Sequence, residues 1–351
     1  MLKTRTKEQN DSLWSLGQKL LGEKDRDIYL SRLDQQLEKY GIGLIFMEED
    51  GYPSLLRQIE KPPEVLFYRG NLSLASRPCL AVVGTRRATA YGEKAAYEIA
   101  KDAASQGFAV VSGMARGIDS CAHKGALDAG GATVALMPAG LDQCYPPSNA
   151  WLFERICSEG LALSEYPPSV RAEKWFFLNR NRLISGLSLG TVVVQAGGRS
   201  GAINTAQHAA EQGRDVFAVP GSIFEFGSVG VHRLIQDGAW LVTSVHSVTD
   251  FYRDQQLTLE DGDPPEKTPA RQNLVLRKMP EEIPAERELT PEANPAGEWQ
   301  WLYDQIDGFG SLPEQLCERT GRSPQMVQTG LTMLELNGLI ERRERQRIYR
   351  K

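Results

Sequence analysis

The sequence lacks the signatures of several protein classes. Its 5 cysteines are widely spaced and form no CxxC pair, which fits neither a disulfide framework nor a zinc knuckle and favours a reducing compartment. The sequence contains no uncharged apolar run of about 20 residues, the length that spans a bilayer, and its first residues have no apolar signal core. We therefore expect a soluble, cytoplasmic protein without membrane contact.

Motifs of nucleotide and hydrolase chemistry are missing as well. No GK[ST] follows a glycine turn, GxGxxG does not occur and no GxSxG elbow is found, so ATP hydrolysis, dinucleotide redox chemistry and serine hydrolysis lack support. Asp119 and His123 are four residues apart and would share a helix face, but the remaining histidines complete no metal site. A helix-capping aspartate and a packed histidine are therefore expected, with no metal, no cofactor and no enzymatic activity.

Acidic side chains outnumber basic ones in the whole chain, 45 to 40, but one segment combines several cations with aromatic rings. The formal net charge is -5 at pH 7, so any contact with nucleic acid must be local. In residues 174–188, KWFFLNRNRLISGLS, one lysine and two arginines accompany Trp175, Phe176 and Phe177. Cations beside flat rings suit a phosphodiester strand whose bases stack. At least one of the three adjacent rings is expected in the core, because they cannot all face the same way.

The hydrophobic pattern divides the chain into four regions. Residues 1–50 have leucines at helical spacing up to about Asp50 and predict a small helical domain of SAM or helix-hairpin-helix type. In residues 51–253, short apolar runs alternate with amphipathic helices, which indicates an α/β fold with a doubly wound, mostly parallel sheet. Residues 254–297 are rich in proline and acidic side chains and read as a flexible linker. Residues 298–351 have a winged-helix outline of three helices and a hairpin.

The first candidate binding element is the strand-to-helix turn in VVGTRRATAYG. Gly84 permits close backbone approach, and Arg86 or Arg87 could hold a phosphate beside the exposed amides of the helix start. A tight turn with surface arginines explains the same residues equally simply.

Two further turns repeat this design. SGMARGIDS bends through Gly113 and Gly117 into a helix, and QAGGRSGAINTA places Ser200 and Gly201 at a helix start with Arg199 just outside. For the third turn, a plain glycine turn with a serine cap remains an open alternative. Several phosphate-sized turns on neighbouring strands are more specific than one.

Several motifs occur together in the order and spacing typical of one protein family. The chain resembles the DprA/Smf family of DNA-processing proteins, and the upstream segment YPSLLRQIEKPPEVLFYRGN and the winged-helix outline are similar too. The motifs are VVGTRRATAYG, SGMARGIDSCAHKGAL, GLDQCYPPSN, SEYPP, RNRLISGLS, SGAINTA and VFAVPG.

The resemblance implies an extended Rossmann-like fold and a non-enzymatic role in natural transformation. Members of this family bind single-stranded DNA, act as homodimers, protect incoming strands and help to load the RecA recombinase. We expect arginines to fix phosphates, helix-start amides to add donors and Phe177 or a neighbour to stack a base, in one continuous trough. The predicted DNA-binding residues are Gly84, Thr85, Arg86, Arg87, Ser112, Gly113, Arg116, Gly117, Lys174, Phe177, Arg180, Asn181, Arg182, Ser185, Gly186, Arg199, Ser200 and Gly201.

Two other functions remain open. Related Rossmann-like proteins bind or cleave nucleoside phosphates, but their PGGxGTxxE motif is reduced here to AGGRSGAIN without the glutamate. A transcription regulator would read duplex DNA with the third helix of the winged helix, yet PQMVQTGLTMLELN contains no lysine or arginine. The basic wing could still touch phosphates or serve partner binding.

Overall fold

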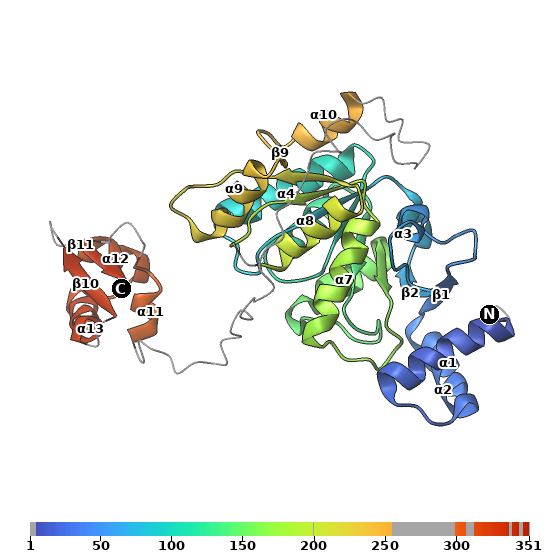
Figure 1. The fold of residues 1–351 in the computed structure, drawn as a ribbon. Helices are drawn as coiled ribbons and strands as arrows, with labels where there is room; N and C mark the ends of the chain where they lie inside the picture. Colours follow the sequence, from blue (N-terminus) through green and yellow to red (C-terminus); the bar gives the residue numbers. More distant parts are fainter. Residues whose placement is uncertain are drawn as a thin grey trace. The chain divides into compact units, whose positions relative to one another are not determined.

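The computed structural model describes residues 5–198, 200–254, 299–306, 312–336, 339–343 and 347–350. The chain forms two compact units, Met1–Pro280 and Glu281–Lys351 (Figure 1). Apart from Asp254, the predicted linker lies outside the described residues.

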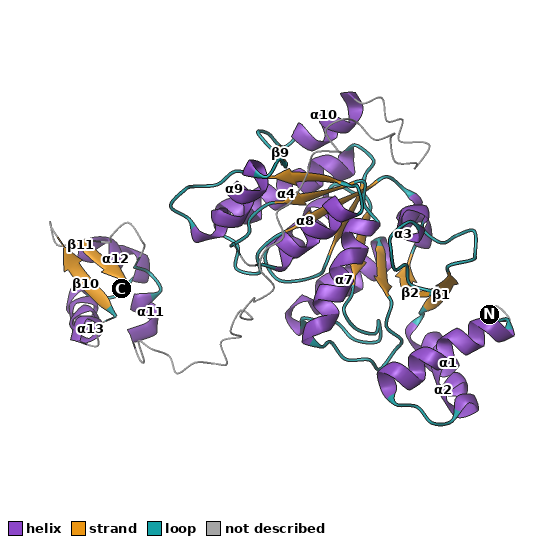
Figure 2. Ribbon diagram, in the orientation of Figure 1, coloured by secondary structure: helices purple, strands orange, loops and turns teal. Residues whose placement is uncertain are grey.

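A nine-stranded sheet forms the centre of the described part of the first unit, in the order β1-β2-β6-β5-β4-β3-β7-β8-β9 (Figure 2). The pairs from β6 through to β9 are parallel, whereas β2 pairs antiparallel with both β1 and β6. This confirms the mostly parallel α/β sheet. The strands are β1 Gly43–Phe46, β2 Val65–Gly70, β3 Cys79–Val83, β4 Ala109–Ser112, β5 Thr133–Leu136, β6 Leu161–Ser164, β7 Gly190–Val193, β8 Asp215–Ala218 and β9 Trp240–Leu241.

Helices cover both faces of this sheet, because successive strand side chains point to opposite faces. In β3, Leu80 and Val82 pack with α4 and α5, whereas Ala81 and Val83 belong to the core formed with α7 and α8. The strands buried on both faces explain the continuous apolar runs of the sequence. The helices are α1 Lys7–Leu21, α2 Arg26–Tyr40, α3 Ser54–Arg57, α4 Ala90–Ser105, α5 Ile118–Asp128, α6 Ala150–Glu159, α7 Lys174–Gly186, α8 Gly201–Glu211, α9 Val229–Gln236 and α10 Ser247–Asp254.

The two N-terminal helices begin and end where the sequence indicates. Thr6 and Asp25 accept hydrogen bonds from first-turn amides, and glycines in the left-handed conformation follow both helices. Their buried side chains, including Leu13 and Leu33, share one core with Phe67 of β2 and with α6. The helices are therefore joined to the sheet by a continuous apolar core.

Three expectations for secondary structure need correction. The segment up to Asp50 was expected to be helical, but residues 43–46 form the edge strand β1. Its partner β2 lies in a segment for which no strand was expected. No crossover helix follows either strand, so the alternation of strand and helix that indicated the parallel strands is absent here. The last apolar run, WLVTSV, forms a strand only at Trp240–Leu241.

The second unit has the predicted winged-helix order. Its described helices are followed by the antiparallel hairpin of β10 and β11, and Leu316, Leu331, Ile340 and Ile348 form part of its buried core. The elements are α11 Gln300–Tyr303, α12 Pro313–Thr320, α13 Pro324–Leu336, β10 Ile340–Arg343 and β11 Arg347–Arg350.

Candidate nucleic-acid interface

Three turns meet at the carboxyl edge of the sheet around β3. The strand order places β3 between β4 and β7, so the chain changes direction there, and open α/β sheets bind ligands at such a switch point. The amide of Thr85 donates to the carbonyl of Gln195 at 2.7 Å, and the amide of Ile118 donates to the carbonyl of Thr85 at 3.3 Å. The first of the three turns predicted from the sequence is therefore in contact with both of the others.

The glycines of these turns make this contact possible. A Cβ on Gly117, whose φ is +73°, would lie 2.5 Å from the carbonyl oxygen of Thr85. A Cβ on Gly84 would lie 2.5 Å from the Ile118 side chain and 2.9 Å from the carbonyl oxygen of Gln195. Real Cβ contacts are not this short, so glycine is needed at both positions for packing between the turns, independently of any phosphate.

The amides of the second turn already have an acceptor. The Asp119 carboxylate accepts hydrogen bonds from the amides of Gly113 at 3.2 Å and Ala115 at 3.3 Å. The expectation that Asp119 caps its own helix is wrong, because α5 begins after Gly117 and the carboxylate reaches back across the turn. These two donors are therefore not available to a phosphate.

Arg180 is a buried structural residue. Its side chain is 4% exposed, and Nη1 donates to the carbonyls of Gly113 at 2.6 Å and Leu136 at 2.5 Å. Burial lowers the pKa of Arg180 to about 10, and the nearby Asp119 opposes that shift. Burial likewise raises the pKa of Asp119, against the effect of Arg180 and the turn amides. The expected phosphate contact of Arg180 is corrected: it ties α7 to the ends of β4 and β5.

Arg182 is also engaged within the protein. It forms a 2.5 Å ion pair with Glu165, with both side chains mostly buried. It also donates to the carbonyl of Lys61 and to the side chain of Asn179. Because a carboxylate already neutralises this guanidinium, the expected phosphate contact of Arg182 is corrected as well.

Further predicted residues of α7 and β4 lie inside the fold. The hydroxyls of Ser112 and Ser185 donate to backbone carbonyls, and the Asn181 amide donates to the carbonyl of Gly201. Gly186 packs against the side chain of Leu56 in α3. Because Ser112, Asn181, Ser185 and Gly186 are all buried, we correct the expectation that they contact a strand directly.

Another group of predicted residues faces solvent. Arg86, Arg87, Arg116 and Lys174 are exposed, and Phe177 is half-buried. The guanidinium carbon of Arg86 lies 5.0 Å from the centroid of the Phe177 ring. Within the described part of the chain, none of these four cations forms an ion pair with a carboxylate. Of the predicted binding residues in the described part of the chain, these four are the cations that remain available to a phosphate.

A second ring in this group was not predicted. Tyr145 packs edge-on against Phe177 with ring centroids 5.2 Å apart, and Nε of Arg116 donates to Oγ of Ser148 at 3.2 Å. The motif GLDQCYPPSN was noted only for its resemblance, and its tyrosine was the available signal. We call Arg86, Arg87, Arg116, Tyr145, Lys174 and Phe177 the ring-and-cation cluster.

The three aromatic rings at the start of α7 differ in burial, as expected. Phe176 is 4% exposed and packs on Tyr166, whereas Trp175 is 52% exposed and Phe177 belongs to the cluster. This confirms that at least one of the three rings is core.

The third turn contributes less than the first two. Ser200 precedes α8, but its hydroxyl has no hydrogen-bond partner within the described part and so forms no side-chain cap. Gly201 is exposed at the first position of the helix. Arg199 lies outside the described residues.

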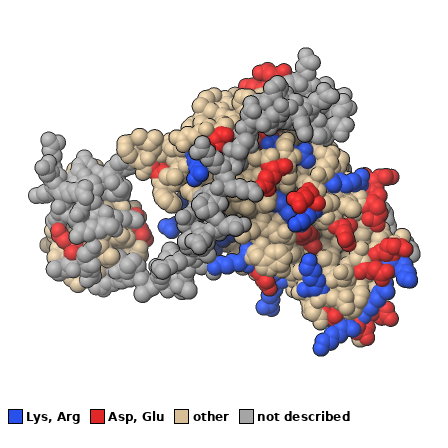
Figure 3. Space-filling view, in the orientation of Figure 1, with Lys and Arg blue, Asp and Glu red and all other residues tan. Residues whose placement is uncertain are grey.

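Charge is intermingled on the face of the molecule drawn in Figure 3, where basic and acidic side chains alternate. Many cations of the described residues have carboxylate partners, as in the pairs Arg69–Glu154 and Arg155–Asp128. A cation's access to phosphate therefore depends on its own surroundings.

Comparison with known proteins identifies the family. Residues 43–253 match the family described as DNA recombination-mediator protein A. The chain belongs to the DprA/Smf family. Residues 311–344 match the DprA winged helix domain, in agreement with the fold of the second unit.

Two relatives in this family each match just over 60% of this chain. The DNA processing protein DprA of Bacillus subtilis is 40% identical over 220 residues, 62% of this chain and 74% of that protein. The DprA of Streptococcus pneumoniae is 43% identical over 222 residues, 63% of this chain and 77% of that protein.

Solved DprA structures have the same fold. The structure of the Streptococcus pneumoniae protein matches with a TM-score of 0.59 at 37% identity, covering 69% of this chain and 92% of that one. A structure that describes the single-stranded DNA binding mode of DprA from Helicobacter pylori matches with a TM-score of 0.56 at 30% identity, covering 61% and 96%.

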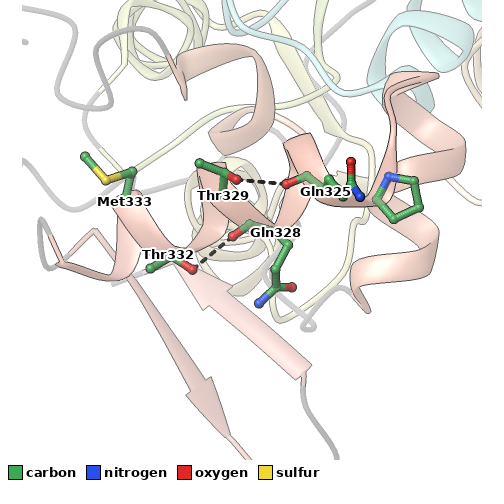
Figure 4. A pocket seen from close by; sticks show the side chains of 6 residues that line it. Gln325, Gln328, Thr329, Thr332 and Met333 are labelled. Atoms are coloured by element: carbon green, nitrogen blue, oxygen red, sulfur yellow. Dashed lines mark hydrogen bonds between the residues drawn. The ribbon is translucent and has the colours of Figure 1, made fainter.

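The DprA-type winged helix presents an uncharged surface on α13. A shallow pocket there is lined by Pro324, Gln325, Gln328, Thr329, Thr332 and Met333, of which Figure 4 labels the last five. The hydroxyls of Thr329 and Thr332 donate to backbone carbonyls one turn earlier. The surface therefore offers no cation for a DNA backbone.

The described residues show neither a metal-binding group nor a membrane-spanning helix. They contain no group of three or more His, Cys, Asp or Glu side chains that could bind a metal. His123 is fully buried, and its Nδ1 lies 2.7 Å from the hydroxyl of Thr133, which confirms a packed histidine. Among the helices described, none is long and apolar enough to cross a membrane.

Proposed function

We propose that this protein binds single-stranded DNA at the ring-and-cation cluster. The observation that carries the proposal is the Arg86 guanidinium, which lies over the Phe177 ring and has no carboxylate partner in the described part of the chain. An unpaired guanidinium can bond a phosphate with two donors, and the adjacent rings can stack unpaired bases. The binding mode described for the Helicobacter pylori relative supports the same ligand.

The proposed role is binding without chemistry. The two residues with acid/base potential near the turns are both buried: Asp119 accepts hydrogen bonds from backbone amides, and His123 packs against Thr133. Incubation with nucleoside monophosphates tests this directly. We expect no release of free base; release would favour the nucleoside-phosphate alternative.

In the cell, we propose that the protein protects incoming single strands during natural transformation and loads the RecA recombinase as a homodimer. Membership of the family supports these roles. The loop before α9 exposes Ile223, Phe224 and Phe226 by 78%, 79% and 81%, and apolar surface of this kind favours contact with another protein chain. Sedimentation of the wild type, and RecA binding to coated strands with and without the protein, test the two partners.

Arg86→Ala tests the DNA site. We expect this variant to weaken binding to oligo-dT by about 1–3 kcal/mol, the usual range for a charge-assisted hydrogen bond. Arg253→Ala is the matched control, because Arg253 is an exposed arginine of α10 that pairs with Asp250. Fluorescence anisotropy measures both. Equal affinities for the two variants would contradict the proposed site.

A further inference from the structure

An exposed tryptophan lies just beyond the ring-and-cation cluster. Trp151 stands in the first turn of α6 and is 56% exposed. The ammonium of Lys124, on the neighbouring helix α5, lies 5.3 Å from the centroid of its ring. The indole ring therefore exposes a large apolar surface to water, with a cation against it, and no packing within the described part of the fold covers that surface.

The same short segment connects this ring to the cluster. Residues 145–151 carry Tyr145, which touches Phe177, and end with Trp151. Between them, the side-chain amide of Asn149 donates to the carbonyl of Met114 and to the hydroxyl of Ser120, both at 2.9 Å. The segment is thus bound to the second glycine turn, and its two rings have fixed positions relative to that turn.

The charged side chains that follow Trp151 on α6 are paired. Farther along α6, Arg155 is bound by Asp128 and Glu159, and Glu154 pairs with Arg69. Lys124 has no carboxylate partner among the described residues. Arg86, Arg116 and Lys124 therefore have no carboxylate partner among the described residues, whereas Arg155 of α6 is paired and neutralised.

We propose that Trp151 and Lys124 form a second base-stacking position for the same single strand. A base would stack on the free face of the indole, and the ammonium would lie near the adjoining phosphate. The inference depends on the proposed function and extends it by giving the strand a direction, from Phe177 past Tyr145 to the first turn of α6. Alternatively, Lys124 and Trp151 are only a surface pair between two helices, and the experiment below separates these two cases.

The test compares short and long oligo-dT in the full-length protein. The chain from Tyr145 to Trp151 spans at most about 22 Å, so an oligomer of about 2 nucleotides can occupy one position and an oligomer of about 25 nucleotides can occupy both. We expect Trp151→Leu to weaken binding of the long oligomer roughly tenfold, the effect of losing one stacked base, and to change binding of the short one less than about twofold. Trp151→Phe keeps a ring and should retain most of the affinity.

Lys124→Gln gives an independent readout. It should lower the slope of log Kd against log salt for the long oligomer by about one phosphate contact and leave the slope for the short oligomer unchanged. Because both side chains are on the surface, the melting temperatures of all three variants should match the wild type.

The outcomes distinguish this proposal from the one it depends on. If Phe177→Leu weakens both oligomers but Trp151→Leu weakens neither, the second position is overturned and the first stands. If Trp151→Leu weakens both oligomers equally, the two rings are not separate positions and the inference is again wrong. If the wild-type protein binds neither oligomer, both proposals fail.

Discussion

Arginines of α7 and arginines of the first two glycine turns have opposite environments, although both segments are basic in sequence. Arg180 and Arg182 are held by carbonyls and by Glu165, whereas Arg86 and Arg116 face solvent without a carboxylate partner in the described part. The difference arises because α7 covers the ends of β4 and β5, where strand carbonyls lack a further partner. Whether an arginine can bind phosphate is thus decided by the acceptors that the fold places beside it.

The sharpest test of this comparison is the removal of a buried arginine. Arg180→Ala leaves the carbonyls of Gly113 and Leu136 and the Asp119 carboxylate without their cation. We expect a loss of about 3–5 kcal/mol in the free energy of unfolding, because a buried charge remains uncompensated.

The matched control is Arg87→Ala, an exposed arginine of the first turn. It should change the free energy of unfolding by less than about 0.5 kcal/mol. Urea denaturation measures both variants. Similar losses for the two would contradict the division into interior and surface arginines.

The pH dependence of stability tests the interior beneath the turns. Burial, helped by the charge of Arg180, lowers the pKa of His123 from its usual 6.5 to about 3. The folded state therefore binds this proton less readily than the unfolded state, so the stability is complete above pH 6.5 and declines as the pH falls toward 3. At pH 5 we expect a loss of about 2 kcal/mol from this group relative to pH 7.

His123→Asn isolates that contribution. Denaturant titrations between pH 7 and pH 5 should show a shallower decline of stability in the variant than in the wild type, whatever its stability at pH 7. Equal slopes would mean that His123 does not titrate differently in the two states.

The smallest expected effect concerns Lys174, one of the exposed cations. Lys174 is exposed at the first residue of α7 and contributes a point charge without fixed geometry. Lys174→Gln should weaken oligo-dT binding by about 1 kcal/mol or less at low salt and lower the salt slope by about one phosphate. Lys39→Gln, on α2, is the control of equal charge change. If both variants bind alike at every salt concentration, Lys174 lies outside the site.

Much of the fold follows from the sequence because its apolar pattern is dense where strands are buried on both faces. Runs such as those of β3 and β4 alternate with amphipathic helices, and this rhythm predicted the parallel part of the sheet. The antiparallel edge was missed because β1 is only partly buried, unlike strands β3 to β8, and β2 lies in a segment without a crossover helix.

The site could be predicted only in outline. The glycine turns and Phe177 were recognised from local sequence, but the burial of Arg180 depends on carbonyls of residues 113 and 136, far from it in the chain. The pairing of Arg182 with Glu165 likewise requires α7 to lie beside the segment after β6. Residue type and spacing do not encode such tertiary partners. Tyr145 was missed because its motif has no local cluster of charge.

If Phe177 stacks a base as proposed, the fixed position of α7 has a consequence for how a strand is released. Phe177 precedes Arg180 by less than one helical turn, and Arg180 is bonded to the ends of two central strands. The stacking ring is therefore ordered in advance, and little conformational entropy is lost when a base arrives. Release of the strand likewise requires no movement of α7. On the proposed function, residence time would then depend on how quickly small ions, or a competing protein, replace the phosphates at the surface, and transfer to a second protein would proceed nucleotide by nucleotide.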